Sequence, residues 1–254
     1  NFTLSHNKNK IKELVRDYVH PETGELINKD RLDVGGLGKA RFILKEGGTL
    51  GDLYTQSDLK RDDNGMVDID PTGIVAIENN LPDIKLGSVF PKANLAWSNH
   101  FSWKGISLSA LFTARIGGIV YSATEAAMDQ YGVSERSALA RDNGGVLVNN
   151  RTLVDAQNYY TTIGSESGLP QYYTYNATNV RLQEASIGYL IPRKWLGNVC
   201  DIQVSVIGRN LWMIYNKAPF DPESVATTDN YYQGIDYFML PSTRNIGFNV
   251  KINF

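Results

Sequence analysis

The last eleven residues of the chain alternate between apolar and polar side chains. One side of an extended chain carries the apolar set, Ile246, Phe248, Val250, Ile252 and Phe254, and the other carries Asn245, Gly247, Asn249, Lys251 and Asn253. A period of two predicts a strand with two different faces. An ordinary half-buried strand of a soluble sandwich has the same pattern. The length also fits the roughly 9 to 11 residues that a tilted strand needs to cross a bilayer, and Phe248 with the terminal Phe254 is typical of a barrel-assembly signal.

Four other segments show the same alternation, and turn signals join them in pairs. They are residues 93–103, 106–116, 180–191 and 199–211. Lys104-Gly105 is a tight-turn dipeptide, and Pro192 ends the third segment because proline has no amide donor. These features predict antiparallel hairpins in an all-β chain.

Short and long links alternate between the predicted strands. The links after Trp103 and Pro192 are short, whereas the stretches 117–178 and 213–242 are long. Tight turns at one membrane surface and long loops at the other are typical of outer-membrane barrels. The sequence therefore predicts a transmembrane antiparallel β-barrel in the bacterial outer membrane, in contact with its lipid. It contains no apolar run long enough for a spanning helix.

Charge and motif content exclude several other functions. The formal net charge is -2 and the basic residues are scattered, so we expect no nucleic-acid partner. There is no nucleophile elbow, zinc-protease helix, P-loop or paired cysteine motif, which predicts that the chain is not an enzyme. We expect no cofactor. The acidic run 62–70 has some calcium-ligand character, but it lacks the terminal glutamate of a calcium loop, and hairpin turns use such residues freely.

The polar faces of the predicted strands supply candidate lumen contacts for a transported substrate. These are His100, Arg115, Asp201, Gln203, Arg209, Asn249 and Lys251. Each is chosen because it alternates with the apolar residues expected to face lipid.

The long loops contain two predicted helices and several tyrosine pairs. One helix is expected over 124–140, with Thr124 as its cap and a break at Gly132, and another over 154–163. The candidate substrate-binding tyrosines are Tyr159, Tyr160, Tyr172, Tyr173, Tyr231 and Tyr232. Paired aromatic rings can stack on sugar rings or pack against peptide side chains, or they can pack the loops against one another.

In their order and spacing, several segments resemble the SusC/RagA-like TonB-dependent outer-membrane transporters. The matching segments are 1–11, 87–94, 101–109, 117–122, 179–192, 206–211, 220–223 and 241–248. Only residues 12–86 match loosely, and their strand number stays open. Asp221 and Glu223 fall in a loop feature of that family, for which we expect a structural turn.

The resemblance implies a barrel of about 22 strands around a plug. Residues 1–254 would then be the C-terminal barrel portion, with the plug and earlier strands in the remainder of the polypeptide. Implied partners are a TonB complex and a SusD-like surface lipoprotein. The implied function is import of oligosaccharides, with peptides as the alternative substrate. A secreted carbohydrate-binding β-sandwich and a surface adhesin or structural barrel are the rival interpretations.

Overall fold

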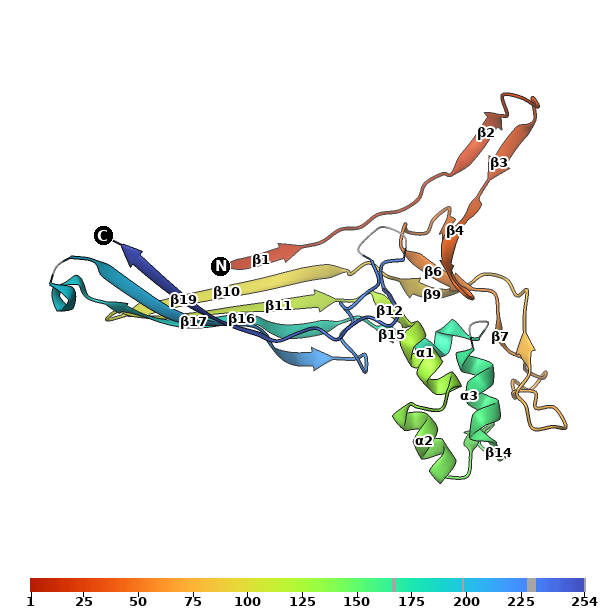
Figure 1. The fold of residues 1–254 in the computed structure, drawn as a ribbon. Helices are drawn as coiled ribbons and strands as arrows, with labels where there is room; N and C mark the ends of the chain where they lie inside the picture. The colour runs from red at the N-terminus through yellow and green to blue at the C-terminus, as the bar shows by residue number, and fades with distance from the viewer. Residues whose placement is uncertain (166–167, 198, 228–231, 254) are drawn as a thin grey trace.

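A six-stranded antiparallel sheet, here called the long sheet, forms the elongated part of the molecule (Figure 1). The computed structural model describes residues 1–165, 168–197, 199–227 and 232–253. In spatial order the strands are β1 (Phe2–Ser5), β10 (Ala93–Trp103), β11 (Ile106–Ile116), β16 (Asn179–Ile191), β17 (Asp201–Asn216) and β19 (Asn245–Asn253). The predicted all-β, antiparallel architecture is confirmed, and all five predicted segments are strands of this sheet.

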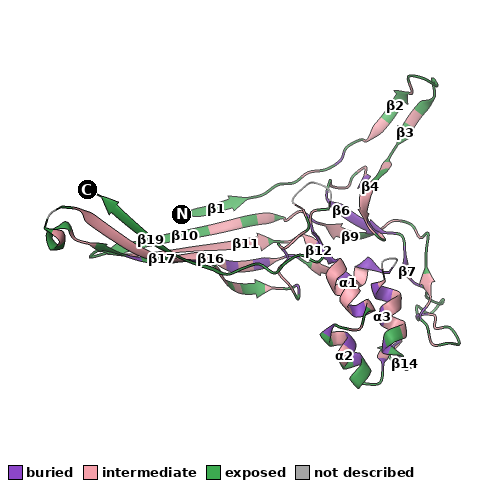
Figure 2. Cartoon of the chain, viewed as in Figure 1, coloured by how far each residue is buried: buried purple, intermediate pink, exposed green. Residues whose placement is uncertain are grey.

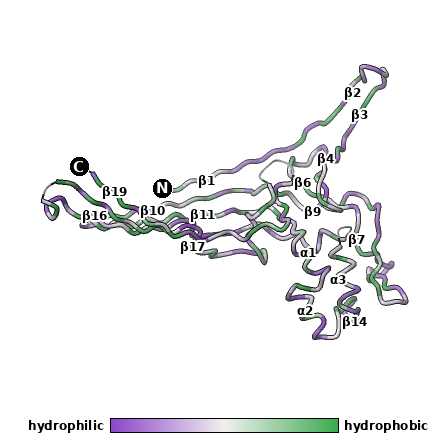
Figure 3. Tube along the Cα trace, in the orientation of Figure 1, coloured by the Kyte–Doolittle hydropathy of each residue, from purple (hydrophilic) through white to green (hydrophobic). Residues whose placement is uncertain are grey.

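The register of the long sheet separates apolar from polar side chains. One cross-strand row is Trp97, Phe112, Leu182 and Trp212, in which the first two rings stack at 5.3 Å between centroids. Three positions further along β10, His100 pairs with Ser109, which pairs with Ser186. Because successive strand residues point to opposite faces, these rows lie on opposite faces of the sheet. Figure 3 shows hydrophobic and hydrophilic residues interleaved along the long strands.

The two short links lie at the same end of the long sheet. Lys104 and Gly105 have φ values of 47° and 87°, which are the left-handed conformations that a two-residue hairpin turn requires. The other short link contains η2 (Arg193–Leu196). All three long connections lie at the opposite end (Figure 1). The predicted alternation of short and long links is therefore confirmed.

The long connections fold together into one structure, which we call the loop region (the described residues of 6–92, 117–178 and 217–244). Its main sheet, here called the loop sheet, contains β4 (Arg31–Leu37), β5 (Ala40–Lys45), β6 (Asp52–Thr55) and β9 (Ile84–Ser88). Its other strands are β2 (Val15–Val19), β3 (Leu26–Lys29), β7 (Asp58–Leu59), β8 (Ile77–Glu78), β12 (Ile119–Ser122), β13 (Val146–Val148), β14 (Thr152–Val154), β15 (Thr174–Asn176) and β18 (Ile235–Asp236). Residues 12–86, whose strand number the sequence left open, thus hold β2 to β8 and the start of β9.

Three helices complete the loop region, α1 (Ala123–Gln130), α2 (Glu135–Asp142) and α3 (Ala156–Gly164), with the 3₁₀ turn η1 (Pro170–Tyr173). The predicted break at Gly132 and the helix near 154–163 are confirmed. The predicted cap at Thr124 is wrong. Ser122 caps α1 instead by accepting from the Glu125 amide at 3.0 Å, because the chain is still extended in β12 up to that residue.

Burial is concentrated in the loop region and not in the long sheet (Figure 2). One apolar cluster joins Phe42 and Leu53 of the loop sheet with Ile163, Tyr173 and Ile235. These residues come from all three connections, so the connections share a single hydrophobic core. The side chains of the long sheet are mostly half-buried or exposed, as expected if another medium covers them.

A cluster of charges joins β4 and β5 to Asp83, the residue that precedes β9. The guanidinium of Arg31 donates to both Asp83 oxygens at 2.9 and 3.0 Å, and the Lys45 ammonium lies 3.0 Å from the same carboxylate. The hydrogen bond from Arg31 is the main reason that the pKa of Asp83 falls to about 2, and Lys45 acts in the same direction.

Substitutions at adjacent positions of β16 test which face meets the membrane. Ala185 lies on the apolar face and Ser186 on the polar face. An arginine facing lipid near the bilayer centre costs about 2–4 kcal/mol, whereas lumen positions tolerate polar side chains. We expect Ala185→Arg to lower the amount of full-length protein assembled in the outer membrane, and Ser186→Arg to assemble nearly normally. Equal assembly of the two variants would contradict the assignment of faces.

The charge cluster predicts a pH dependence for the loop sheet. A carboxylate whose folded pKa lies below its unfolded value of about 3.9 stabilises the fold above that value and loses this contribution as the pH falls towards 2. Amide hydrogen exchange of β4, β5 and β9 in the full-length protein, corrected for its intrinsic pH dependence, should accelerate between pH values of about 5 and 2. In the Asp83→Asn variant, the amides of these strands should exchange fast at both ends of this pH range. If the variant kept the pH profile of the native protein, the pH dependence could not be assigned to Asp83.

Candidate functional site

The seven predicted lumen residues all lie on the polar face of the long sheet. His100 pairs with Ser109, and Gln203 with Lys251. Arg209 donates from Nε to Glu184 Oε2 at 2.8 Å across β16 and β17, in a solvent-exposed ion pair. The remaining members are Arg115, Asp201 and Asn249, which the register places in the same set. This face presents hydroxyl, amide and charged groups, which are suited to hydrogen bonding a polar solute.

A buried ion-pair cluster closes the polar face beside the loop region. The side chain of Arg181 on β16 is 5% exposed and holds Asp221 in a fork, with nitrogen to oxygen distances of 2.8 and 3.2 Å. Glu223 lies 3.2 Å from the same guanidinium and accepts from the Asn179 amide at 3.3 Å. The sequence predicted only a structural turn for Asp221 and Glu223 and did not single out Arg181. The cluster attaches the third long connection to the sheet.

Hydrogen bonds favour the ionised form of Asp221 in this cluster. Burial opposes ionisation of Asp221, but hydrogen bonds from Arg181 and from the Glu223 amide outweigh it, so the pKa of Asp221 lies below its ordinary value. The Asp221 carboxylate is therefore ionised at neutral pH, and the Arg181 guanidinium contacts both Asp221 and Glu223. A bidentate, charge-assisted pair of this kind fixes the relative orientation of the two side chains and also stabilises the fold.

Arg115 lies next to the buried cluster and is only partly satisfied. Its Nη2 donates to the Val89 carbonyl at 2.7 Å, whereas its buried Nε has no partner within the described residues. A hollow of about 400 Å³ opens beside it, and Asn94, Thr113, Gln183 and Glu223 also line this space. The hollow offers unused polar groups at the junction of the long sheet and the loop region.

Most of the predicted tyrosine platform packs the loops together. Tyr159 and Tyr160 meet edge to face at 5.4 Å, and burial raises the pKa of Tyr159 to about 12. Tyr173 is completely buried, and Tyr172 is half-buried. Rings in these positions have little face left for a ligand, so they serve mainly as loop packing in this conformation.

Only one tyrosine of the remaining pair lies within the described residues. Tyr232 packs edge to face against Phe42 at 6.4 Å and is 41% exposed. Tyr231, like Phe254, lies outside the described residues. Phe248 faces Val206 on the apolar face of β19.

A buried polar network underlies the helices. The Asp129 carboxylate accepts from Tyr173 Oη at 2.9 Å and pairs with Arg136 Nε at 2.8 Å, and Ser134 also donates to it. Arg136 in turn lies over the Tyr173 ring, with its guanidinium carbon 4.9 Å from the centroid. This network joins α1, α2 and η1 into one rigid unit.

Exposed aromatic residues gather at another place, which the sequence did not indicate. Tyr131, Tyr237 and Phe238 are 76%, 53% and 59% exposed. They border a hollow of about 310 Å³ beside α1. None of them belongs to a tyrosine pair, and only the folding of two distant connections onto each other brings them together.

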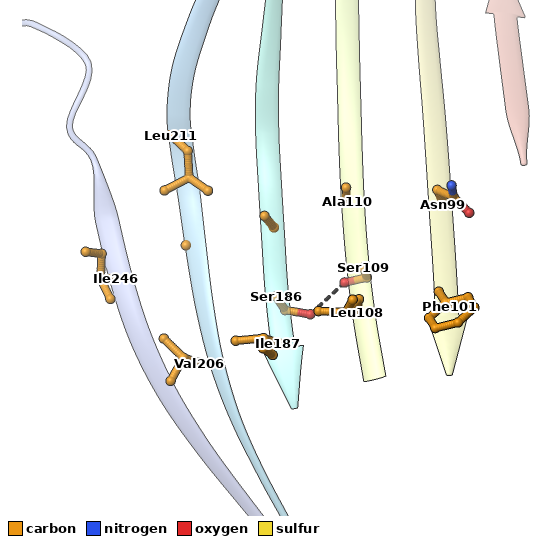
Figure 4. A pocket seen from close by; sticks show the side chains of 12 residues that line it. Asn99, Phe101, Leu108, Ser109, Ala110, Ser186, Ile187, Val206, Leu211 and Ile246 are labelled. Atoms are coloured by element: carbon orange, nitrogen blue, oxygen red, sulfur yellow. Dashed lines mark hydrogen bonds between the residues drawn. The ribbon is translucent and has the colours of Figure 1, made fainter. Parts of the chain in front are cut away.

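The apolar face of the long sheet also carries a hollow, of about 640 Å³ (Figure 4). Ala110, Ala185 and Gly208 form a row of small residues across three strands. Bulkier side chains surround this row, namely Phe101, Leu108, Ile187, Val206, Leu211 and Ile246. Its lining is suited to hydrocarbon chains and not to a polar solute.

The acidic run 62–70 forms turns. Asp62 Oδ1 accepts from the Asn64 and Met66 amides, and Asp70 Oδ1 accepts from the Thr72 and Ile74 amides. Among the described residues, no group of three or more histidine, cysteine, aspartate or glutamate side chains is arranged to hold a metal ion. No described helix has both the length and the apolar character needed to cross a bilayer.

Comparison with known proteins supports the fold and the resemblance seen in the sequence. No family model matches the chain. A curated relative, TonB-dependent receptor P3 of Formosa agariphila, is 25% identical over 283 aligned residues, which cover 98% of this chain and 26% of that protein. The chain thus spans about a quarter of the length of the relative it matches.

Solved structures of the RagAB peptide transporter are similar to the whole chain. One structure has a TM-score of 0.62 at 16% identity and is covered over 27% of its length. The RagAB importer in its closed-closed and open-open states gives TM-scores of 0.63 and 0.60, each at 16% identity, with 27% and 26% of those chains covered. The fold is therefore that of part of a RagA-type barrel. The resemblance to SusC/RagA-like TonB-dependent transporters and the predicted outer-membrane location are confirmed.

Two ion pairs of β16 and β17 form a matched test of the junction. Removing one partner of a buried pair costs about 3–5 kcal/mol, whereas an exposed pair contributes about 0–1 kcal/mol. We expect Arg181→Met to increase amide hydrogen exchange in residues 217–225 of the full-length protein strongly. Arg209→Met, which breaks the exposed pair with Glu184, should leave that segment nearly unchanged. Similar exchange in both variants would show that Arg181 does not hold the connection.

Proposed function

We propose that this chain forms part of the wall and the extracellular loops of a TonB-dependent outer-membrane importer. The observation that supports it is the combination of a sheet with one apolar and one polar face and long connections gathered at one end. A wall of this kind separates lipid from a hydrated lumen, and the loop region then lies where a solute first arrives. No catalytic role is proposed for these residues.

The rest of the importer is proposed to lie in the remainder of a longer polypeptide, for which residues 1–254 supply the C-terminal barrel portion. In the described sheet β1 and β19 each pair with one neighbour only. An open edge in hydrocarbon leaves backbone groups unpaired, so further strands must adjoin both edges. The remaining strands and a plug would complete the barrel, and energy would reach the plug through a TonB complex.

The substrate we propose is an oligosaccharide, delivered with a SusD-like surface lipoprotein over the loop region. Hydroxyl, amide and charged groups on the lumen face, which can hydrogen-bond sugar hydroxyls, and exposed aromatic rings in the loop region support this class. Peptides are the second candidate, because the solved structures of similar fold belong to a transporter described as importing peptides. His100, Arg115, Asp201, Gln203 and Arg209 are the proposed lumen contacts.

Uptake by the proposed importer requires energy supplied through TonB, which distinguishes it from a passive barrel. Cells expressing the full-length protein, with and without a functional tonB gene, would be given fluorescent oligosaccharides and, separately, fluorescent peptides. We expect accumulation to require TonB, while binding at the cell surface persists without it. Accumulation that is independent of TonB would refute the importer. Accumulation of peptides alone would keep the importer and replace the substrate class.

A further inference from the structure

Two hollows on the helices of the loop region, here called the first and second compartments, share lining residues at the end of α1, among them Tyr131. The first measures about 310 Å³ and the second about 280 Å³, and both are lined by Gln130 and Tyr131. The Tyr131 ring is 76% exposed although it borders both spaces. The exposed phenol ring is therefore placed where a ligand in either hollow can contact it.

The first compartment has aromatic walls held in fixed positions. Tyr237 and Phe238 meet edge to face at 5.2 Å, and the Phe238 amide donates to Thr124 Oγ1 of α1 at 2.8 Å. Small residues of α1 and α3 form its floor, because the two helices approach so closely that a Cβ on Gly164 would lie 2.5 Å from the Ala126 carbonyl. Exposed aromatic rings gathered around a hollow are typical of ligand-binding grooves and interaction surfaces.

The second compartment is polar. Asp129 contributes to its lining, but its carboxylate is already used by Arg136, Ser134 and Tyr173. The side-chain amides of Gln130 and Gln157 and the Arg141 guanidinium also line it, and none of the three has a hydrogen-bond partner in the part of the chain that the structure describes. They supply unused donors and acceptors for hydroxyl groups.

We propose that these compartments bind two consecutive neutral sugar residues of an oligosaccharide, one in each compartment and both in contact with Tyr131. The apolar face of a sugar ring packs on the aromatic walls, and its hydroxyl groups reach the amides and the guanidinium. Each volume is near the lower limit of small-molecule pockets, which fits one ring better than an extended chain. The inference deepens the proposed function, on which its substrate class rests.

The test is direct binding to purified full-length protein in detergent, using an array of short neutral oligosaccharides with a peptide array in parallel. For the oligosaccharide that binds best, Tyr131→Ala should weaken affinity by about tenfold or more, because a ring that lines both compartments is lost. Tyr131→Phe should bind nearly as well as the native protein, since stacking does not require the hydroxyl. Ala127→Leu should also weaken binding by filling the first compartment.

Tyr18 supplies the matched control. It is an exposed tyrosine on β2, 51% exposed and remote from both compartments, so Tyr18→Ala should bind normally. Because the Tyr131 ring is so exposed, its removal should not affect folding, which the heat-dependent electrophoretic mobility of the barrel checks. Unchanged oligosaccharide affinity in Tyr131→Ala, or a loss of peptide binding alone, would overturn the inference.

The outcomes separate this site from the importer. TonB-dependent uptake together with oligosaccharide binding that ignores Tyr131 would refute the site and leave the importer standing. Oligosaccharide binding that depends on Tyr131, together with uptake that does not need TonB, would support the site and refute the importer.

Discussion

The structure depends on one constraint, that every backbone amide and carbonyl within hydrocarbon must find a partner inside the protein. The inner strands of the long sheet meet it by continuous antiparallel pairing from β1 to β19, whereas the outer edges of β1 and β19 require further strands. Since pairing fixes register, and register fixes which way each side chain points, the apolar and polar faces follow from the ladder. The two-residue turn at Lys104-Gly105 preserves that register between β10 and β11.

The distribution of buried residues is the reverse of that in a soluble β-sandwich. The long sheet has no packed interior of its own, whereas the loop region has a core shared by all three connections. Two different solvents explain the contrast, because lipid covers the apolar face of the long sheet whereas water surrounds the loop region. Arg181 and Arg115 lie where the parts meet, and each joins a wall strand to a loop segment.

The features that sequence could predict are local. Alternation, the Lys104-Gly105 turn and the break at Gly132 all depend on neighbouring residues, and the structure agrees with them, although β17 continues to Asn216 beyond its predicted end at residue 211. The pairing of Arg181 with Asp221 spans 40 residues, and Arg181 lies between two register irregularities, at Val180/Arg181 and at Leu182/Glu184, which no local pattern encodes.

Candidate binding residues were harder to predict for a related reason. Doubled tyrosines are conspicuous in a sequence. Tyr173 is nevertheless buried in the core, where its hydroxyl donates a hydrogen bond to Asp129. The exposed ring of Tyr131 carries no comparable signal, because its exposure depends on where α1 ends and on how residues 237–238 return to it. Exposure is a property of the tertiary fold, and composition alone does not reveal it.

The shared core of the loop region has a consequence for how such proteins diversify. Because the loop region is stabilised by its own hydrophobic core, substitutions on its surface need not disturb insertion of the long sheet into the membrane. A lineage could therefore exchange one recognition surface for another while keeping the same membrane scaffold. The junction residues, and not the sheet as a whole, would then set the limits of that exchange.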